Sequence, residues 1–245
     1  KEKNGLYGWI GATEEIRFED SNIDPDLEDT PPKHRDPFKG GNNPGTVAFH
    51  EQRKSFAASV AKPQTIYMSQ TANFHNMATS SPRKADDAIT FTLYARQVNE
   101  VRHLVSMTDL LALTSGGVWK VSGASSEVLT ADSTPLARRQ VKYGCSHVPP
   151  LEIGEEVLFV HDSGRRVRNL GYRLEIEGYS GNDLTILASH LFEEHRITDW
   201  TYAEDPHGVV WVVRSDGQLL GLTYLREHEV WGWHRHDTQG EFESV

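Results

Sequence analysis

The chain has 245 residues, of which 37% are hydrophobic and 24% charged, enough apolar material to bury a sizeable core. It carries 25 Lys and Arg against 35 Asp and Glu, and a formal net charge of −10 makes it a poor candidate for binding nucleic acid through phosphates. No apolar run reaches the roughly 18 residues of a membrane-spanning helix, so we expect no membrane anchor. The single cysteine excludes an internal disulfide and a thiolate zinc site.

The N-terminal segment differs in composition from the rest. Between Lys1 and Asp36 there are ten acidic and five basic residues, which is half of the net charge of the chain. The segment contains Pro25, Pro31 and Pro32, and turn formers follow at 39–45. We expect residues 1–44 to be an extended acidic arm, or the end of an inserted region, and residues 45–245 to form the main domain. The only strand-like pieces of the arm are Leu6–Ile10 and Ile16–Phe18.

The chain begins at Lys1 rather than at a methionine, so we expect it to be a fragment of a longer protein.

From Thr46 onward, short apolar runs alternate with turn dipeptides, which predicts β-hairpins. Leu110–Thr114 is followed by Gly116-Gly117, and Val157–Val160 is followed by Asp162-Ser163-Gly164.

The last of these runs predicts four strands joined by short turns. Leu220, Leu222 and Tyr224 alternate with Gly221, Thr223 and Leu225, so the first three are expected to share one face. The expected strands are Ile197–Ala203, Val209–Arg214, Gln218–Leu225 and Glu229–His236.

The hairpin pattern repeats. The centres of the buried strands are expected near Ala57, Ala112, Phe159 and Trp211, at spacings of 55, 47 and 52 residues. A period of about 40–50 residues with several strands per repeat is typical of β-propeller blades. We therefore predict an all-β, propeller-like fold with about four blade-like units of short antiparallel strands. A β-sandwich and a mixed α+β fold are the alternatives.

Helical pattern is scarce in the sequence. Thr185–Glu194 is compatible with one short helix or with a strand followed by a turn. Ala78–Ala88 is polar and is expected to be a loop.

Two histidines near the C-terminus have the spacing of metal ligands. His234 and His236 lie two positions apart, on one face of a strand, with Asp237 or Glu241 as a further oxygen ligand. We favour an ordinary strand with Trp231 and Trp233 on its other face, because the sequence has no His-Glu-x-x-His motif.

Other reactive residues have ordinary explanations as well. Cys145 precedes His147, but a lone cysteine among apolar strands is more often part of the core. Asp216 occupies a turn, and the run Arg165–Arg168, preceded by Arg138-Arg139, is expected to be a solvated face, a subunit contact or a phosphate contact. Asp183, Asp199, Glu204 and Asp205 are candidates for paired carboxylates by residue type only. We assign no catalytic, cofactor-binding or metal-ligating residue, and we expect no cofactor.

Several blocks of the chain resemble the tail nozzle, or tail tubular protein B, family of short-tailed bacteriophages. The resemblance runs from about Tyr7 to the end, and its longest blocks are Asp183–Leu191 and Trp211–Gly240. The prophage relatives of this family are labelled packaged-DNA stabilisation or structural proteins. The other blocks are Gly8–Gly11, Pro44, His50–Lys54, Ile89–Gly117, Tyr143–Ser146 with Pro149-Pro150, Arg168–Tyr172 and Leu220–Val245.

The resemblance implies a structural virion component and a protein that is not an enzyme. Such proteins form a ring, typically sixfold, at the end of the tail, where they extend the DNA channel and help to retain and eject packaged DNA. The implied partners are further copies of the chain, the adaptor and the tail fibre or spike, and passing DNA without sequence-specific binding. The implied location is the virion tail, assembled in the cytoplasm of the bacterial host. The chain is shorter than a full nozzle protein.

Two other functions remain open from the residues themselves. A carbohydrate-binding propeller would use exposed tryptophans, for which Trp200, Trp231 and Trp233 are the candidates. A protein-interaction propeller is the other alternative, although the repeats lack its Gly-His and Trp-Asp signature.

Overall fold

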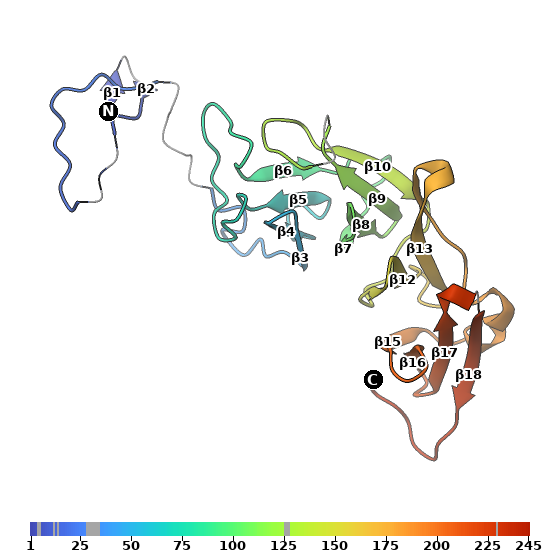
Figure 1. Cartoon of the computed structure of the whole chain (residues 1–245). Helices are drawn as coiled ribbons and strands as arrows, with labels where there is room; N and C mark the ends of the chain where they lie inside the picture. Colours follow the sequence, from blue (N-terminus) through green and yellow to red (C-terminus); the bar gives the residue numbers. More distant parts are fainter. Residues whose placement is uncertain (4–5, 12, 14, 28–34, 125–127, 229) are drawn as a thin grey trace. The chain divides into compact units, whose positions relative to one another are not determined.

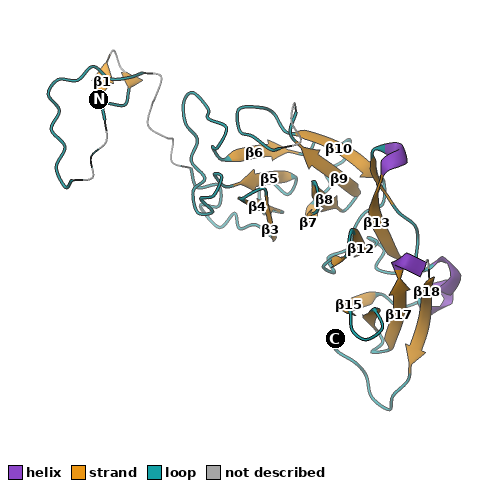
Figure 2. Cartoon of the chain, in the orientation of Figure 1, coloured by secondary structure: helices purple, strands orange, loops and turns teal. Residues whose placement is uncertain are grey.

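The computed structural model describes residues 1–3, 6–11, 13, 15–27, 35–124, 128–228 and 230–245 (Figure 1). Pro31 and Pro32 of the expected arm, and Glu229 of the expected last strand, lie outside the described residues. Within them, regular structure is almost entirely β, and helix is limited to short 3-10 turns (Figure 2). The prediction of an all-β fold with four blade-like units is confirmed.

The chain divides into two compact units. The first contains Lys1–Tyr94 and Ser122–Leu136, and the second contains Ala95–Val121 and Ala137–Val245. The expected domain boundary between residues 44 and 45 stays a prediction, and the first four-stranded sheet begins just after it, at Thr46.

The first unit contains one four-stranded antiparallel sheet and a short hairpin. The hairpin pairs β1 (Glu2–Lys3) with β2 (Leu6–Tyr7). The prediction of a strand at Ile16–Phe18 is wrong, and Ile16 is fully exposed. Ile16 and Phe18 alternate with charged residues as they would in a strand, but both are exposed, so the apolar face that the alternation would create is not packed. The sheet has the order β3 (Thr46–His50), β4 (Arg53–Ala57), β5 (Thr65–Met68), β6 (Ile89–Thr92).

A buried arginine holds the loop before β6 in this unit. The guanidinium of Arg53 donates hydrogen bonds to the carbonyl oxygens of Ser69 at 2.8 Å, Ala85 at 2.7 Å and Asp87 at 2.5 Å. The Asp87 carboxylate accepts the backbone N–H of Ser80 at 2.8 Å and of Lys84 at 3.0 Å. These hydrogen bonds pair polar groups that burial would otherwise leave unsatisfied. The predicted loop at Ala78–Ala88 is confirmed.

The second unit contains three four-stranded antiparallel sheets, each with its strands in chain order. The first sheet contains β7 (Val101–Ser106), β8 (Leu110–Thr114), β9 (Gly117–Ser122) and β10 (Leu136–Val141); the next contains β11 (Leu151–Ile153), β12 (Glu156–Val160), β13 (Val167–Arg173) and β14 (Gly178–Ser180); the last contains β15 (Ile197–Ala203), β16 (Val209–Arg214), β17 (Leu219–Leu225) and β18 (Val230–His236). The turns predicted at Gly116-Gly117 and at Asp162-Ser163-Gly164 connect β8 to β9 and β12 to β13.

The predicted repeat coincides with the sheets. Each predicted strand centre lies in the second strand of a different sheet: Ala57 in β4, Ala112 in β8, Phe159 in β12 and Trp211 in β16. The predicted spacing is therefore the number of residues between the second strands of successive sheets.

The middle sheet of the second unit contributes to two apolar cores. Val157 and Phe159 of β12 belong to a cluster shared with β7, β8 and β9, whereas Leu158 and Val160 belong to a cluster shared with the last sheet. Alternate residues of a strand point to opposite faces, so one strand packs on both neighbouring sheets. The predicted shared face of β17 is confirmed, because Leu220, Leu222 and Tyr224 all belong to one buried apolar cluster.

A similar polar contact joins each pair of neighbouring sheets in this unit. Asp109, just before β8, accepts the phenol hydroxyl of Tyr179 at 3.3 Å. Glu156, the first residue of β12, accepts the hydroxyl of Tyr224. In both pairs a carboxylate at the start of a second strand meets a tyrosine of the following sheet.

The ambiguous segment Thr185–Glu194 contains the 3-10 helix η2 (Ile186–Leu191). Its backbone leaves helical geometry at Ala188, at φ −125° and ψ 27°, so the six residues do not form a continuous helix. The shorter 3-10 helices are η1 (Leu174–Ile176) and η3 (Arg226–His228).

Candidate functional site

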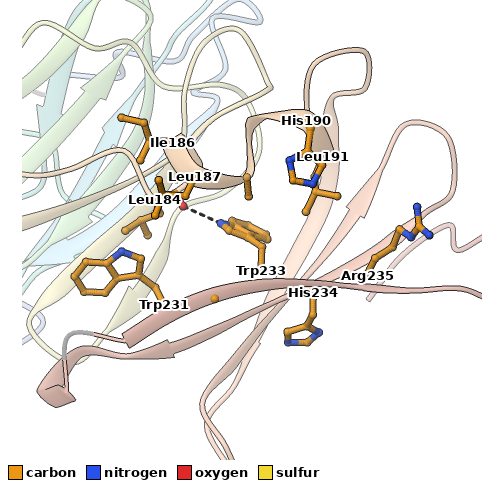
Figure 3. A pocket seen from close by; sticks show the side chains of 11 residues that line it. Leu184, Ile186, Leu187, His190, Leu191, Trp231, Trp233, His234 and Arg235 are labelled. Carbon is orange, nitrogen blue, oxygen red and sulfur yellow. Dashed lines mark hydrogen bonds between the residues drawn. The ribbon is translucent and has the colours of Figure 1, made fainter.

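An open groove lies between η2 and the edge strand β18 of the last sheet (Figure 3). Its volume is about 490 Å³. Most of the side chains that line it are aliphatic or aromatic. The residues that line it, through side chain or backbone, are Leu184, Ile186, Leu187, Ala188, His190, Leu191, Trp231, Gly232, Trp233, His234 and Arg235.

Trp233 fixes the floor of the groove. Its indole Nε1–H donates to the carbonyl oxygen of Leu184 at 2.8 Å. Its ring meets Phe192 edge to face, with centroids 4.8 Å apart and an interplanar angle of 77°. Both contacts attach β18 to residues that flank η2, and they therefore hold the two walls of the groove in position.

The rim of the groove is apolar and exposed. Leu187 is 92% exposed, Ile186 72% and Trp231 38%. Exposed large apolar side chains that lie together mark interaction surfaces more often than isolated ones do. Together with Arg235, these rim residues have the composition of a protein-contact surface, in which aromatic residues and Arg are enriched.

The alternation of β18 separates two sets of side chains. Trp231, Trp233 and Arg235 lie on the groove side of the strand, whereas the His234 side chain points to its other side (Figure 3). His234 Nδ1 lies 2.8 Å from His236 Nε2, so the expected placement of both histidines on one face is confirmed.

The two acidic residues predicted to complete a metal site are engaged elsewhere or lie apart. Asp237 is 3.1 Å from Arg235 Nε and accepts the Gln218 side-chain amide at 3.1 Å. Glu241 lies over Gly217. Among the residues that the structure describes, no group of three or more His, Cys, Asp or Glu is placed to hold a metal ion.

Three of the candidate carboxylates accept hydrogen bonds from different groups of the protein. Asp216 accepts Arg214 Nε–H at 3.0 Å, and this hydrogen bond lowers the pKa of the Asp216 carboxyl below its usual range. Asp183 Oδ1 accepts the backbone N–H of Thr185 at 2.9 Å, and Asp199 Oδ2 accepts that of Val245 at 3.1 Å. The remaining two, Glu204 and Asp205, are exposed in the β15–β16 turn.

The arginine run is divided by the fold. Arg168 is buried and stacks on the Tyr143 ring, with its Cζ 3.6 Å from the centroid. Arg165 and Arg166 instead line a second cavity, of about 500 Å³, together with Asp183, Ser189 and Glu193 among others. Arg166 Nη1 lies 3.8 Å from Asp183 Oδ2, so an acidic group already faces the cation there.

Cys145 is part of the core, as its ordinary explanation predicted. It is fully buried, and burial raises the pKa of its thiol from 9.0 to about 12. We expect the native protein at pH 8 to resist alkylation by iodoacetamide, because only about one thiol in ten thousand is then ionised. Mass spectrometry checks this: modification is expected only after unfolding in guanidinium chloride, and rapid labelling of the native chain would contradict it.

The three tryptophans proposed for sugar binding do not form one platform. Trp200 is buried, and its Nε1–H donates to Pro149 O at 2.6 Å. The Trp233 ring packs against Phe192, and its Nε1–H donates to the carbonyl oxygen of Leu184. Of the three tryptophans, only Trp231 is an exposed large side chain.

The exposed pair Ile186 and Leu187 was not singled out from the sequence. A run such as TILASHLF has the composition of a buried segment, and its exposure depends on the 3-10 geometry of η2. The available signal was its ambiguity, since neither a helical nor a strand period buries all its apolar residues.

The chain matches no protein-family model, and no curated protein sequence matches it. Solved structures that match this chain include human WBSCR16, with 13% identity over 81% of this chain and 55% of that chain and a TM-score of 0.45. A protein from Lactobacillus plantarum has 11% identity over 81% of this chain and 59% of that chain, with a TM-score of 0.49. The chain thus spans less than two thirds of both proteins.

A third match corrects one prediction. A luciferin-regenerating enzyme shares 10% identity over 74% of this chain and 72% of that chain, with a TM-score of 0.30. The prediction that the chain is not an enzyme is overturned by this match and is withdrawn. A match of this level assigns no reaction to the chain.

No helix in the described part of the chain has the length and apolar character needed to cross a bilayer.

Proposed function

We propose that the chain is a structural component of the tail of a short-tailed bacteriophage or prophage, part of the nozzle ring through which packaged DNA leaves. In this proposal it assembles in the bacterial cytoplasm with further copies of itself and with the adaptor and the tail fibre or spike. It remains in the virion tail and helps to retain DNA until ejection.

The observation that carries the proposal is the position of the two longest blocks of resemblance. Asp183–Leu191 contains η2, and Trp211–Gly240 contains β18, and these elements form the two walls of the groove. The chain between the blocks does not separate them in space, because Trp233 bonds to Leu184 and packs on Phe192. The blocks therefore build one exposed apolar surface, which supports a shared role in binding another protein.

The surface fits a ring better than a two-fold dimer. Closed rings of more than two copies use heterologous interfaces, in which two different patches meet. The groove is concave, with exposed Ile186, Leu187 and Trp231 at its rim. A neighbouring copy that presents a different, protruding surface would bury these side chains.

The charge of the chain supports a channel rather than a DNA-binding site. Each contact between a Lys or Arg and a phosphate adds affinity, whereas a net charge of −10 repels the DNA backbone. An acidic ring would favour sliding of DNA over sticking. A net basic surface facing the channel of the assembled ring would contradict this part of the proposal.

The first test is assembly. The full-length protein, mixed with its adaptor and tail partners, is expected to form a closed ring of about six copies with a central channel, measured by mass photometry and negative-stain imaging. A protein that stays monomeric with these partners, at concentrations at which the adaptor itself is assembled, would contradict the proposal.

The groove itself is tested by a charge on its rim. We expect Leu187→Asp to prevent ring formation and to leave the melting temperature within about 2 °C, because the side chain is 92% exposed and contributes little to the fold. Leu174→Asp is the matched control, since Leu174 is 78% exposed in η1, outside the groove lining. Rings formed equally by both variants would show that the groove is not the interface.

A further inference from the structure

We propose that His234 and His236 together bind a divalent transition-metal ion, in the order of affinity Cu²⁺, Ni²⁺, Zn²⁺, on the side of β18 opposite to the groove. This inference is independent of the proposed function, because it depends on the other face of the strand. The two imidazoles are the only protein ligands proposed, and water completes the coordination.

The distance between the two ring nitrogens suits a chelated ion. His234 Nδ1 and His236 Nε2 lie 2.8 Å apart. Two imidazole nitrogens that bind a metal at about 2.0–2.1 Å, with an angle of about 90° at the metal, are separated by about 2.9 Å. Chelation therefore requires the rings to turn, so that both nitrogens point at the ion, with almost no change in their separation.

The strand fixes both rings before a metal arrives. His234 and His236 are alternate residues of β18, and β18 pairs with β17 in continuous register over Leu219–Leu225. The Trp211 ring on β16 flanks both histidines, with centroids 6.1 Å from His234 and 4.9 Å from His236. A pair that is already aligned loses less conformational entropy on binding than two mobile side chains do.

Gly221 provides the space for the His234 ring. It lies opposite His234 in the β17–β18 register, and a Cβ on Gly221 would lie 2.1 Å from His234 Cε1. Any larger residue would displace the ring. Thr223 Oγ1 lies 3.4 Å from His234 Nε2, the nitrogen that faces away from His236, and can orient the ring through it.

The order of metals follows from the ligands. Two neutral imidazoles with open coordination positions suit Cu²⁺ and Ni²⁺ better than Zn²⁺. The affinity of divalent ions for such a site rises along the first transition row through Ni²⁺ to Cu²⁺ and falls at Zn²⁺. A hard ion such as Mg²⁺ prefers oxygen ligands, and neither proposed ligand atom is an oxygen.

The test uses the untagged full chain and Ni²⁺ or Cu²⁺ alone. Isothermal titration with Ni²⁺ is expected to show one site, and His234→Gln and His236→Gln are each expected to weaken it at least tenfold. His190→Gln is the control, because His190 is an exposed histidine on the groove side of the same sheet. Equal affinity in the unchanged protein and both single variants, or an equal loss in the control, would overturn the proposal.

A second measurement needs no variant. The electron paramagnetic resonance spectrum of the Cu²⁺-loaded protein is expected to show coupling to two equatorial imidazole nitrogens, and Cu²⁺ is expected to quench the fluorescence of nearby Trp211. Coupling to a single nitrogen, or to none, would overturn the proposal even if a histidine variant failed to fold.

Discussion

Replacing Arg53 by methionine is expected to lower the free energy of unfolding by about 3–5 kcal/mol. Arg53 is 1% exposed, and its guanidinium donates to the carbonyl oxygens of Ser69, Ala85 and Asp87. Methionine fills much of the same volume but donates no hydrogen bond, so these carbonyls lose their charged partner in a buried place. Urea denaturation followed by circular dichroism measures the change.

The matched control for this prediction is Arg83→Met. Arg83 lies in the same loop and is exposed, so its replacement is expected to change stability by less than about 0.5 kcal/mol. Hydrogen exchange should show faster exchange at 78–88 in Arg53→Met than in the control. Similar stability of the two variants would mean that the loop is not held by the Arg53 guanidinium.

Glu156→Met is expected to cost about 3 kcal/mol or more. The buried Glu156 carboxylate accepts the Tyr224 hydroxyl and the Asn169 side-chain amide at 3.0 Å, and it lies 3.3 Å from Arg226 Nε. Methionine leaves the hydroxyl and the amide without an acceptor between two packed sheets. Burial, together with the hydrogen bond to Glu156, raises the pKa of Tyr224 above its usual range.

The neighbouring glutamate is the control for this variant. Glu155 also faces Arg226, at 3.5 Å, but its side chain is 88% exposed, so Glu155→Met is expected to have an effect below about 1 kcal/mol. The double variant Glu156→Met with Tyr224→Phe should be less destabilised than the sum of the single variants, since Phe removes the stranded hydroxyl. Simple additivity would show that the two side chains do not act together.

The strands and their sheets follow from the sequence because short-range signals determine them. The turn at Ser215-Asp216-Gly217 and the alternation at Leu220, Leu222 and Tyr224 place β16 and β17 to within a residue or two of their observed ends. The spacing of the strand centres also indicated the repeat. Each of these signals lies within one hairpin or recurs in the next one.

The groove and the inter-sheet contacts could not be predicted in this way. The contact of Trp233 with Leu184 joins residues 49 positions apart, and that of Glu156 with Tyr224 joins residues 68 apart. No period in the sequence indicates which tyrosine reaches which carboxylate. The burial of Arg53 could not be predicted either, because an arginine in a β-hairpin ordinarily points to solvent.

The double packing of β12 limits how the chain can tolerate insertions. Val157 and Phe159 serve one core, and Leu158 and Val160 serve the other. One extra residue within this strand would exchange the two sets and place each against the wrong neighbour. Length variants of this protein should therefore accumulate extra residues in the turns, such as 161–166, or gain a whole sheet at once, while the strand itself keeps its five residues.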